Sequence, residues 1–191
     1  MVAFDFIITL MSFVYALAMT HLLSRAGALV LARDRVAFSG LQALAMLNAI
    51  LLVYADWLTT WATRTLRDWD LLSITVLFVG AVSNYFVCVA AVPNDLPSEG
   101  PIGLDAFYWK NRLLYWSVVS ALNVLALPAN SIFGKSLNPH LVLQTDLATL
   151  PAFVPCIVAI AAKQRWAQWV AGLGLLATTL VFMIMFDTDL R

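Results

Sequence analysis

The chain has 191 residues, of which 62% are hydrophobic and only 12% are charged. A soluble domain is typically about half apolar and about a quarter charged, so a water-soluble fold of this size is excluded. The net charge is zero and the 11 basic residues are scattered in twos and threes, which excludes a nucleic-acid-binding surface.

Apolar runs long enough to cross a bilayer as helices, which takes about 18 residues or more, recur along the chain. No Lys or Arg precedes the first run, unlike a secretory signal peptide, so we expect it to be retained. Charged residues end the first run at Arg33 and Pro93 ends the third, and a loop rich in Pro and Gly follows. Aromatic and basic residues before the fourth run predict an interfacial entry turn, with Asp105 as the helix N-cap. The six expected spans cover about residues 4–31, 38–61, 71–92, 113–133, 140–162 and 166–186.

These spans leave only short connections, so residues 1–191 are expected to form a single domain. The predicted fold class is an all-α integral membrane protein, a single bundle of six transmembrane helices surrounded by the lipid bilayer. Arg outnumbers Lys eight to three, and Ala and Leu dominate, which is typical of a GC-rich bacterial genome. We therefore expect a multi-pass protein of the bacterial inner membrane.

The distribution of basic residues predicts the orientation. The connections after the first, third and fifth spans carry seven Lys and Arg residues, whereas the side with both termini carries four. The seven are Arg25, Arg33, Arg35, Lys110, Arg112, Lys163 and Arg165, and the four are Arg64, Arg67, Lys135 and Arg191. Since basic residues concentrate on the cytoplasmic side, both termini are predicted to be periplasmic or extracellular.

Acidic residues gather at the predicted outer face. Asp56 lies about 7 Å below the outer end of the second span, and Asp146 about 9 Å below the start of the fifth, at 1.5 Å per residue. Asp5 opens the first span at the same face. The rim above them carries Asp68, Asp70, Asp187 and Asp189. The pattern predicts a water-filled vestibule that attracts cations or passes protons inward. Alternatively, Asp56 and Asp146 take up water or pair with Arg64 or Arg67.

Three amides, Asn48, Asn84 and Asn123, fall near the middle of the second, third and fourth spans. An amide in hydrocarbon must find a partner, and bonds between helices are its usual role. A polar site at the midplane is the alternative. It is favoured by Pro128 in the fourth span and by two prolines in the fifth, because each proline frees a backbone carbonyl.

Small residues recur every fourth position along the first span, at Ser12, Ala16, Thr20 and Ser24. Such a face lets another helix approach closely. We expect it to pack inside the bundle or between copies of the chain, and we expect Ala16→Leu to destabilise the protein more than Ala18→Leu.

No motif for a catalytic, cofactor or metal site is present in the sequence, so we expect neither an enzyme nor a bound cofactor. The leading hypothesis is a channel or transporter for a small cation or polar solute, acting as a homo-oligomer. The rival is a structural or accessory subunit that docks onto another membrane protein and transports nothing. The two differ in whether the polar residues converge on a path or pair off helix by helix.

Overall fold

A computed structural model describes residues 2–66, 69–97, 99–137 and 139–185 of the chain. This part of the chain is helical except for its loops and one pair of two-residue strands. The elements in chain order are α1 (Val2–Leu31), η1 (Arg33–Arg35), β1 (Val36–Ala37), α2 (Gly40–Trp61), η2 (Ala62–Thr65), α3 (Leu71–Ala90), β2 (Ile102–Gly103), α4 (Leu104–Leu137), α5 (Pro139–Thr149), η3 (Leu150–Ala152), α6 (Phe153–Ala161) and α7 (Arg165–Met185).

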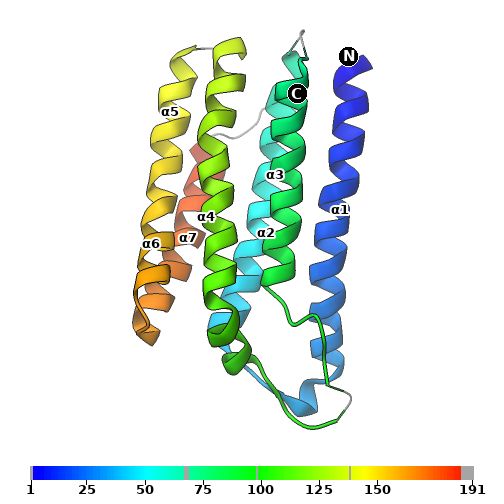
Figure 1. The fold of residues 1–191 in the computed structure, drawn as a ribbon, viewed down its shortest axis with the longest axis vertical. Helices are drawn as coiled ribbons and strands as arrows, with labels where there is room; N and C mark the ends of the chain where they lie inside the picture. Colours follow the sequence, from blue (N-terminus) through cyan, green and yellow to red (C-terminus); the bar gives the residue numbers. More distant parts are fainter. Residues whose placement is uncertain (1, 67–68, 98, 138, 186–191) are drawn as a thin grey trace.

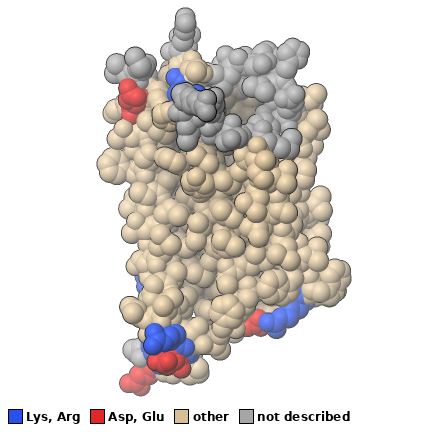
Figure 2. Space-filling view, turned by 180° about the vertical axis from the view of Figure 1, so that it is seen from behind, with Lys and Arg blue, Asp and Glu red and all other residues tan. Residues whose placement is uncertain are grey.

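Five helical stretches are long and apolar enough to cross a membrane. They are Phe4–Leu31, Gly40–Thr65, Leu71–Ala90, Leu104–Phe133 and Arg165–Ile184. The helices stand side by side, and successive helices run in opposite directions except for α5 and α6, which follow one another in the same direction (Figure 1). Charged residues gather near the two ends of the face in Figure 2, and uncharged residues cover its middle. The prediction of an all-helical chain with a membrane protein's composition is confirmed.

The expected fifth span is not one continuous helix. A short apolar helical stretch, Asp146–Ala161, takes its place and is interrupted by the 3-10 turn η3. Pro151 lies in that turn and Pro155 in the first turn of α6. Proline cannot donate a backbone hydrogen bond and clashes with the preceding turn, which accounts for the break. In Figure 1, α6 nevertheless continues in the direction of α5.

Helix α4 begins nine residues before the expected start of the fourth span, at Leu104, so the predicted entry turn is itself helical. Asp105 is therefore in the first helical turn and not at the N-cap, which corrects that prediction. Its carboxylate instead accepts bonds from Ser39 Oγ, at 3.1 Å, and Arg165 Nη2, at 2.9 Å. Pro128 lies within α4 and does not end it.

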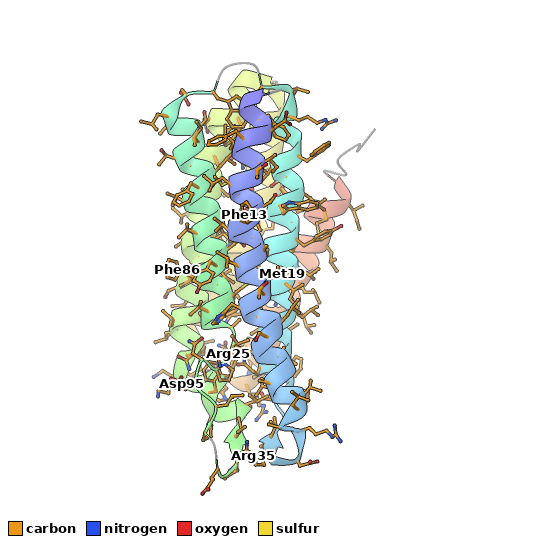
Figure 3. All side chains as sticks on the ribbon, turned by 90° about the vertical axis from the view of Figure 1, so that its right-hand side faces the viewer. Phe13, Met19, Arg25, Arg35, Phe86 and Asp95 are labelled. Carbon is orange, nitrogen blue, oxygen red and sulfur yellow. The ribbon has the colours of Figure 1, made fainter. Side chains whose placement is uncertain are left out.

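Helix α2 is central in the bundle, because it packs against α1, α3, α4 and α7. Helix α1 packs against α2 and α3, and α4 packs against α3, α5 and α6. Trp116, Met11 and Leu22 are among the largest fully buried side chains. The core therefore lies around α2, and α1 closes one side of it; in Figure 3, α1 stands in front of α2 and α3.

The side of α1 that faces the bundle is not the one that carries the small residues. Its buried residues include Met11, Tyr15, Ala18 and Leu22, which repeat at intervals of three and four. Of the small residues expected at a packing face, Ser12 is half-buried, whereas Ala16, Thr20 and Ser24 are exposed. These small residues do not line the contact of α1 with α2 and α3, because the large apolar residues of α1 occupy it. Within one chain, the burial of Ala18 and the exposure of Ala16 predict the opposite of the expected ranking, with Ala18→Leu more destabilising than Ala16→Leu.

One end of the bundle is fastened by a parallel strand pair. Residues 36 and 37 of β1 pair with residues 102 and 103 of β2, which joins the α1–α2 loop to the α3–α4 loop. Arg35 Nη1 donates to the backbone oxygens of Pro97, at 3.2 Å, and Gly100, at 3.5 Å. The Asp105–Arg165 ion pair adds the start of α7 to the same end.

Candidate functional site

The candidate site is centred on Asp56, near the end of α2. Tyr15 Oη on α1 donates a hydrogen bond of 2.8 Å to Asp56 Oδ2. Asn84 Nδ2 on α3 donates one of 2.7 Å to the same oxygen. Three helices therefore meet at one carboxyl group, and two of them each provide a donor.

Local sequence explains why the three side chains meet. Tyr15 lies on the buried face of α1, and Asn84 lies on the buried face of α3, one turn from Ala81. Gly80 lies beside the carboxyl group, where a Cβ atom added to it would make an ordinary contact, 3.8 Å from Asp56 Oδ2. Thr60 Oγ1 donates to the backbone oxygen of Asp56 at 2.9 Å and lies 3.4 Å from Tyr15 Oη. The threonine thus fills the side of the site nearest the end of the helix.

No positive charge balances Asp56 within the described part of the chain, where its two hydrogen-bond donors are uncharged. Arg64, proposed as a partner from the sequence, donates to the backbone oxygen of Trp61, and its guanidinium lies 5.5 Å from the centre of that ring. The other proposed partner, Arg67, is outside the described residues. The site is therefore a carboxyl group among neutral donors.

Asn84 has one polar atom without a partner. Its side chain is 0% exposed, and its nitrogen donates to Asp56 and, at 3.2 Å, to the backbone oxygen of Gly80. Its oxygen, Oδ1, is buried and accepts no hydrogen bond. A buried acceptor without a donor is unfavourable by about 1–3 kcal/mol. Among the residues that the structure describes, the site therefore lacks one hydrogen-bond donor, the one that Asn84 Oδ1 would accept from.

Asp146, the predicted companion of Asp56, has different partners. Asn130 Nδ2 on α4 donates a hydrogen bond of 3.0 Å to Asp146 Oδ1 on α5. The same nitrogen lies 3.3 Å from Thr149 Oγ1. The Asp56 donors come from α1 and α3, so the two carboxylates belong to separate clusters. Their expected union in one vestibule stays a prediction.

The two remaining amides bond to neighbouring backbone or sulfur. Asn48 Nδ2 on α2 donates 2.9 Å to the backbone oxygen of Gly172 on α7, and Asn48 Oδ1 has no partner. Asn48 lies where residues of α2, α4 and α7 meet. Asn123 Nδ2 donates 3.0 Å to the Val119 oxygen and lies 3.8 Å from Cys156 Sγ. The bond of Asn48 joins two helices, whereas Asn123 bonds to the backbone of its own helix and reaches α6 only through its contact with Cys156.

The acidic rim is only partly described. Asp5 is exposed near the start of α1, and Asp70 caps the start of α3 by accepting 2.8 Å from the Ser73 backbone N–H. Hydrogen bonds from Ser73 hold the pKa of Asp70 below its usual value. The other three rim residues, Asp68, Asp187 and Asp189, lie outside the described residues.

A second polar network was missed from the sequence. Arg112, expected in an interfacial turn, is 6% exposed and donates to the backbone oxygens of Ala159, at 2.8 Å, and Ala162, at 2.6 Å. Gln168 Nε2 donates to the same two oxygens at 2.9 and 2.6 Å, and Tyr108 Oη donates 2.8 Å to Gln168 Oε1. Similarly, Gln42 Nε2 donates to the Ala91 oxygen at the end of α3. The sequence signal for this network was a basic or amide residue in an otherwise apolar helix. The helix that it bonds to is the one interrupted by prolines.

Within the described residues, no group of three or more His, Cys, Asp or Glu side chains is placed to share a metal ion. No protein-family model, curated protein or solved structure matches the chain. The function must therefore be inferred from the geometry of the chain itself.

Proposed function

We propose that the chain is a multi-pass protein of the bacterial inner membrane that serves as a structural or accessory subunit and transports nothing itself. The observation that carries this proposal is the pairing of the polar groups within the bundle. Asn48, Asn123 and Gln168 each donate to backbone groups of their own or adjacent helices, and Asp146 accepts from the neighbouring α4. Bonds of this kind hold helices together in hydrocarbon.

The proposed topology has six crossings, with α5, η3 and α6 together making the fifth. A break at proline is tolerated in a membrane when neighbouring groups bond the freed backbone. Arg112 and Gln168 supply such donors at the end of α6. By the excess of basic residues, the end with the strand pair faces the cytoplasm and both termini face outward.

Cysteine labelling tests this orientation. On a background of Cys88→Ala and Cys156→Ala, Glu99→Cys in the α3–α4 loop should resist an impermeant reagent in intact cells and react after permeabilisation. Thr65→Cys, beyond α2, should react in intact cells. The opposite pattern would invert the topology.

The proposed partner surface is the outer side of α1. Ala16, Thr20 and Ser24 are exposed there on a helix that packs on α2 and α3. Small residues let a second helix come close, either from another copy in a homo-oligomer or from a different membrane protein.

Crosslinking and flux measurements test the proposal together. On the cysteine-free background, Thr20→Cys should crosslink in native membranes, whereas the buried control Ala18→Cys should not. Native protein in proteoliposomes should pass no more cation than empty liposomes. Robust flux without a crosslink at residue 20 would reject the accessory role.

A channel or transporter for a small cation or polar solute is the second candidate. It is favoured by Asp56, whose carboxyl group has no basic partner among the described contacts. Flux that is lost in Asp56→Asn and unchanged in Asp56→Glu would support this candidate, and the Asp146→Asn variant would show whether the second cluster takes part.

A further inference from the structure

The two donors at Asp56 are arranged as they would be around a neutral carboxylic acid. Both Tyr15 Oη and Asn84 Nδ2 bond to the same oxygen, Oδ2. An ionised carboxylate has two equivalent oxygens with about four acceptor positions in total. In the half-buried carboxyl group of Asp56, both donors nevertheless bond to one of the two oxygens. A protonated acid instead has one carbonyl oxygen, which accepts two bonds, and one hydroxyl, which donates. Convergence on Oδ2 therefore assigns it the carbonyl role and leaves Oδ1 as the hydroxyl.

Asn84 provides the acceptor that such a hydroxyl needs. Its Oδ1 is buried without a partner, while its own nitrogen is bonded to the Asp56 carboxyl group. A carboxylic acid and a carboxamide can form a cyclic pair, in which the amide N–H donates to the acid carbonyl and the acid O–H donates to the amide oxygen. One proton on Asp56 Oδ1 would thus provide the donor that Asn84 Oδ1 lacks.

We propose that Asp56 and Asn84 form a proton-binding site, in which a proton on Asp56 Oδ1 is donated to Asn84 Oδ1. The site goes beyond the accessory role proposed above and does not depend on it. The proton comes from water on the nearby side of the bundle, and its release leaves a carboxylate. No other bond is made or broken.

The surrounding groups are compatible with a neutral acid. Tyr15 is the titratable group of α1 that contacts Asp56, and α3 contributes Cys88, buried one turn beyond Asn84. From α4, Tyr115 donates to the backbone oxygen of Ala45 at 3.2 Å. The charged group of η2 is Arg64, over the Trp61 ring, and that of α7 is Arg165, which pairs with Asp105 at the fastened end. None of these contacts brings a positive charge to the Asp56 carboxyl group.

A proton fits this site better than a metal ion does. Hard metal cations gather about six or more oxygen ligands, and a hydrated ion also needs space. Here Asp56 Oδ2 is occupied by two donors and Thr60 Oγ1 donates to a backbone oxygen. Two acceptors, Asp56 Oδ1 and Asn84 Oδ1, remain, and one proton joins them.

Infrared spectroscopy of the purified full chain in lipid nanodiscs tests the site. At about pH 7, where an ordinary aspartate is ionised, we expect the wild type to show the carbonyl band of a protonated carboxyl group. Asp56→Asn should abolish the band, and this substitution keeps an amide that can still pair with Asn84. The matched control Asp146→Asn should retain the band. Absence of an Asp56-dependent band at this pH would overturn the proposal.

Two further measurements make the result specific. In Asn84→Ala the band should shift to higher frequency, because the acid carbonyl loses one of its two donors; an unshifted band would place the proton elsewhere. If that variant does not fold, the wild type, Asp56→Asn and Asp146→Asn still decide the outcome. Replacing choline chloride by sodium chloride at equal ionic strength should leave the band unchanged. Loss of the band in sodium would identify a metal-cation site and reject the proton.

Discussion

Two side chains donate to the same pair of carbonyl oxygens at the end of α6, and this redundancy leads to a quantitative prediction. Arg112 Nη1 and Gln168 Nε2 each bond to the backbone oxygens of Ala159 and Ala162. Either donor alone keeps both oxygens bonded. We therefore expect the double variant Arg112→Met, Gln168→Met to lose more stability than the sum of the two single variants, of which Gln168→Met also removes the acceptor of Tyr108 Oη.

The size of the extra loss in the double variant depends on how deeply the two carbonyl oxygens are buried. Ala159 is 0% exposed, whereas Ala162 is half-buried and its oxygen can reach water or lipid headgroups. A buried acceptor left without any donor is destabilising by about 1–3 kcal/mol. Only the double variant leaves the Ala159 oxygen in that state. Its loss in free energy of unfolding should thus exceed the sum of the single losses by about 1–3 kcal/mol.

The assay is a double-mutant cycle on the apparent free energy of unfolding, measured by SDS titration in mixed micelles. A control cycle combines Arg112→Met with Asn123→Leu, which lies about 16 Å further along α4 at 1.5 Å per residue. The control losses should add within about 0.5 kcal/mol. Additive losses in the Arg112 and Gln168 cycle as well would refute the idea that the shared carbonyl oxygens couple these residues.

Three other substitutions test separate features. Ala18→Leu should lower the melting temperature more than Ala16→Leu, since Ala18 is fully buried and overpacking is destabilising by about 1–3 kcal/mol; equal melting temperatures would contradict the packing of α1. Gly172→Val should lower the melting temperature similarly, because an added Cβ atom would lie 2.5 Å from a leucine side chain of α2. Gly27→Val is the control in the same thermal unfolding experiment, because a Cβ atom added at Gly27 has no neighbour within 4 Å. Hydrogen bonds from Ser73, in the first turn of α3, lower the pKa of Asp70. The stabilisation that depends on the charge of Asp70 is therefore present above the ordinary pKa of an aspartate, and it is lost as the pH falls below about 4. Asp70→Asn keeps the cap without the charge and should flatten the acid dependence of unfolding, and an unchanged slope would exclude this contribution.

Helix boundaries could be predicted where a local signal sets them. The third span was expected over about residues 71–92, and α3 covers Leu71–Ala90 because Asp70 caps its start and Pro93 follows its end. The apolar span was expected to start at residue 113 because charged and aromatic residues at 105–112 resemble a membrane interface, whereas the helix N-cap expected at Asp105 lies one residue after the start of α4 at Leu104. Here they are helical, and Arg112 is buried against the end of α6. Composition alone does not reveal a partner that lies 47 residues further along the chain.

The candidate site could be predicted only in part. An aspartate in an apolar run identified Asp56, and the amide at residue 84 was noted separately. Their contact, and that with Tyr15, joins residues 28 and 41 positions apart and depends on how α1, α2 and α3 rotate. The periodicity of small residues located a face of α1 without showing whether that face turns inward or outward. Rotation about the helix axis is set by packing of Met11 and Leu22, which no pattern within α1 alone determines.

The strand pair between residues 36–37 and 102–103 has a consequence for the biogenesis of the chain. Synthesis completes β1, α2 and α3 before β2 exists, so the backbone of β1 must bond to water during that interval. The pair closes only if the α3–α4 loop has reached the same side of the membrane as the α1–α2 loop. Protease protection of ribosome-bound chains ending before and after residue 103 measures this step. We expect a chain with α3 inserted the wrong way round to lack the strand pair.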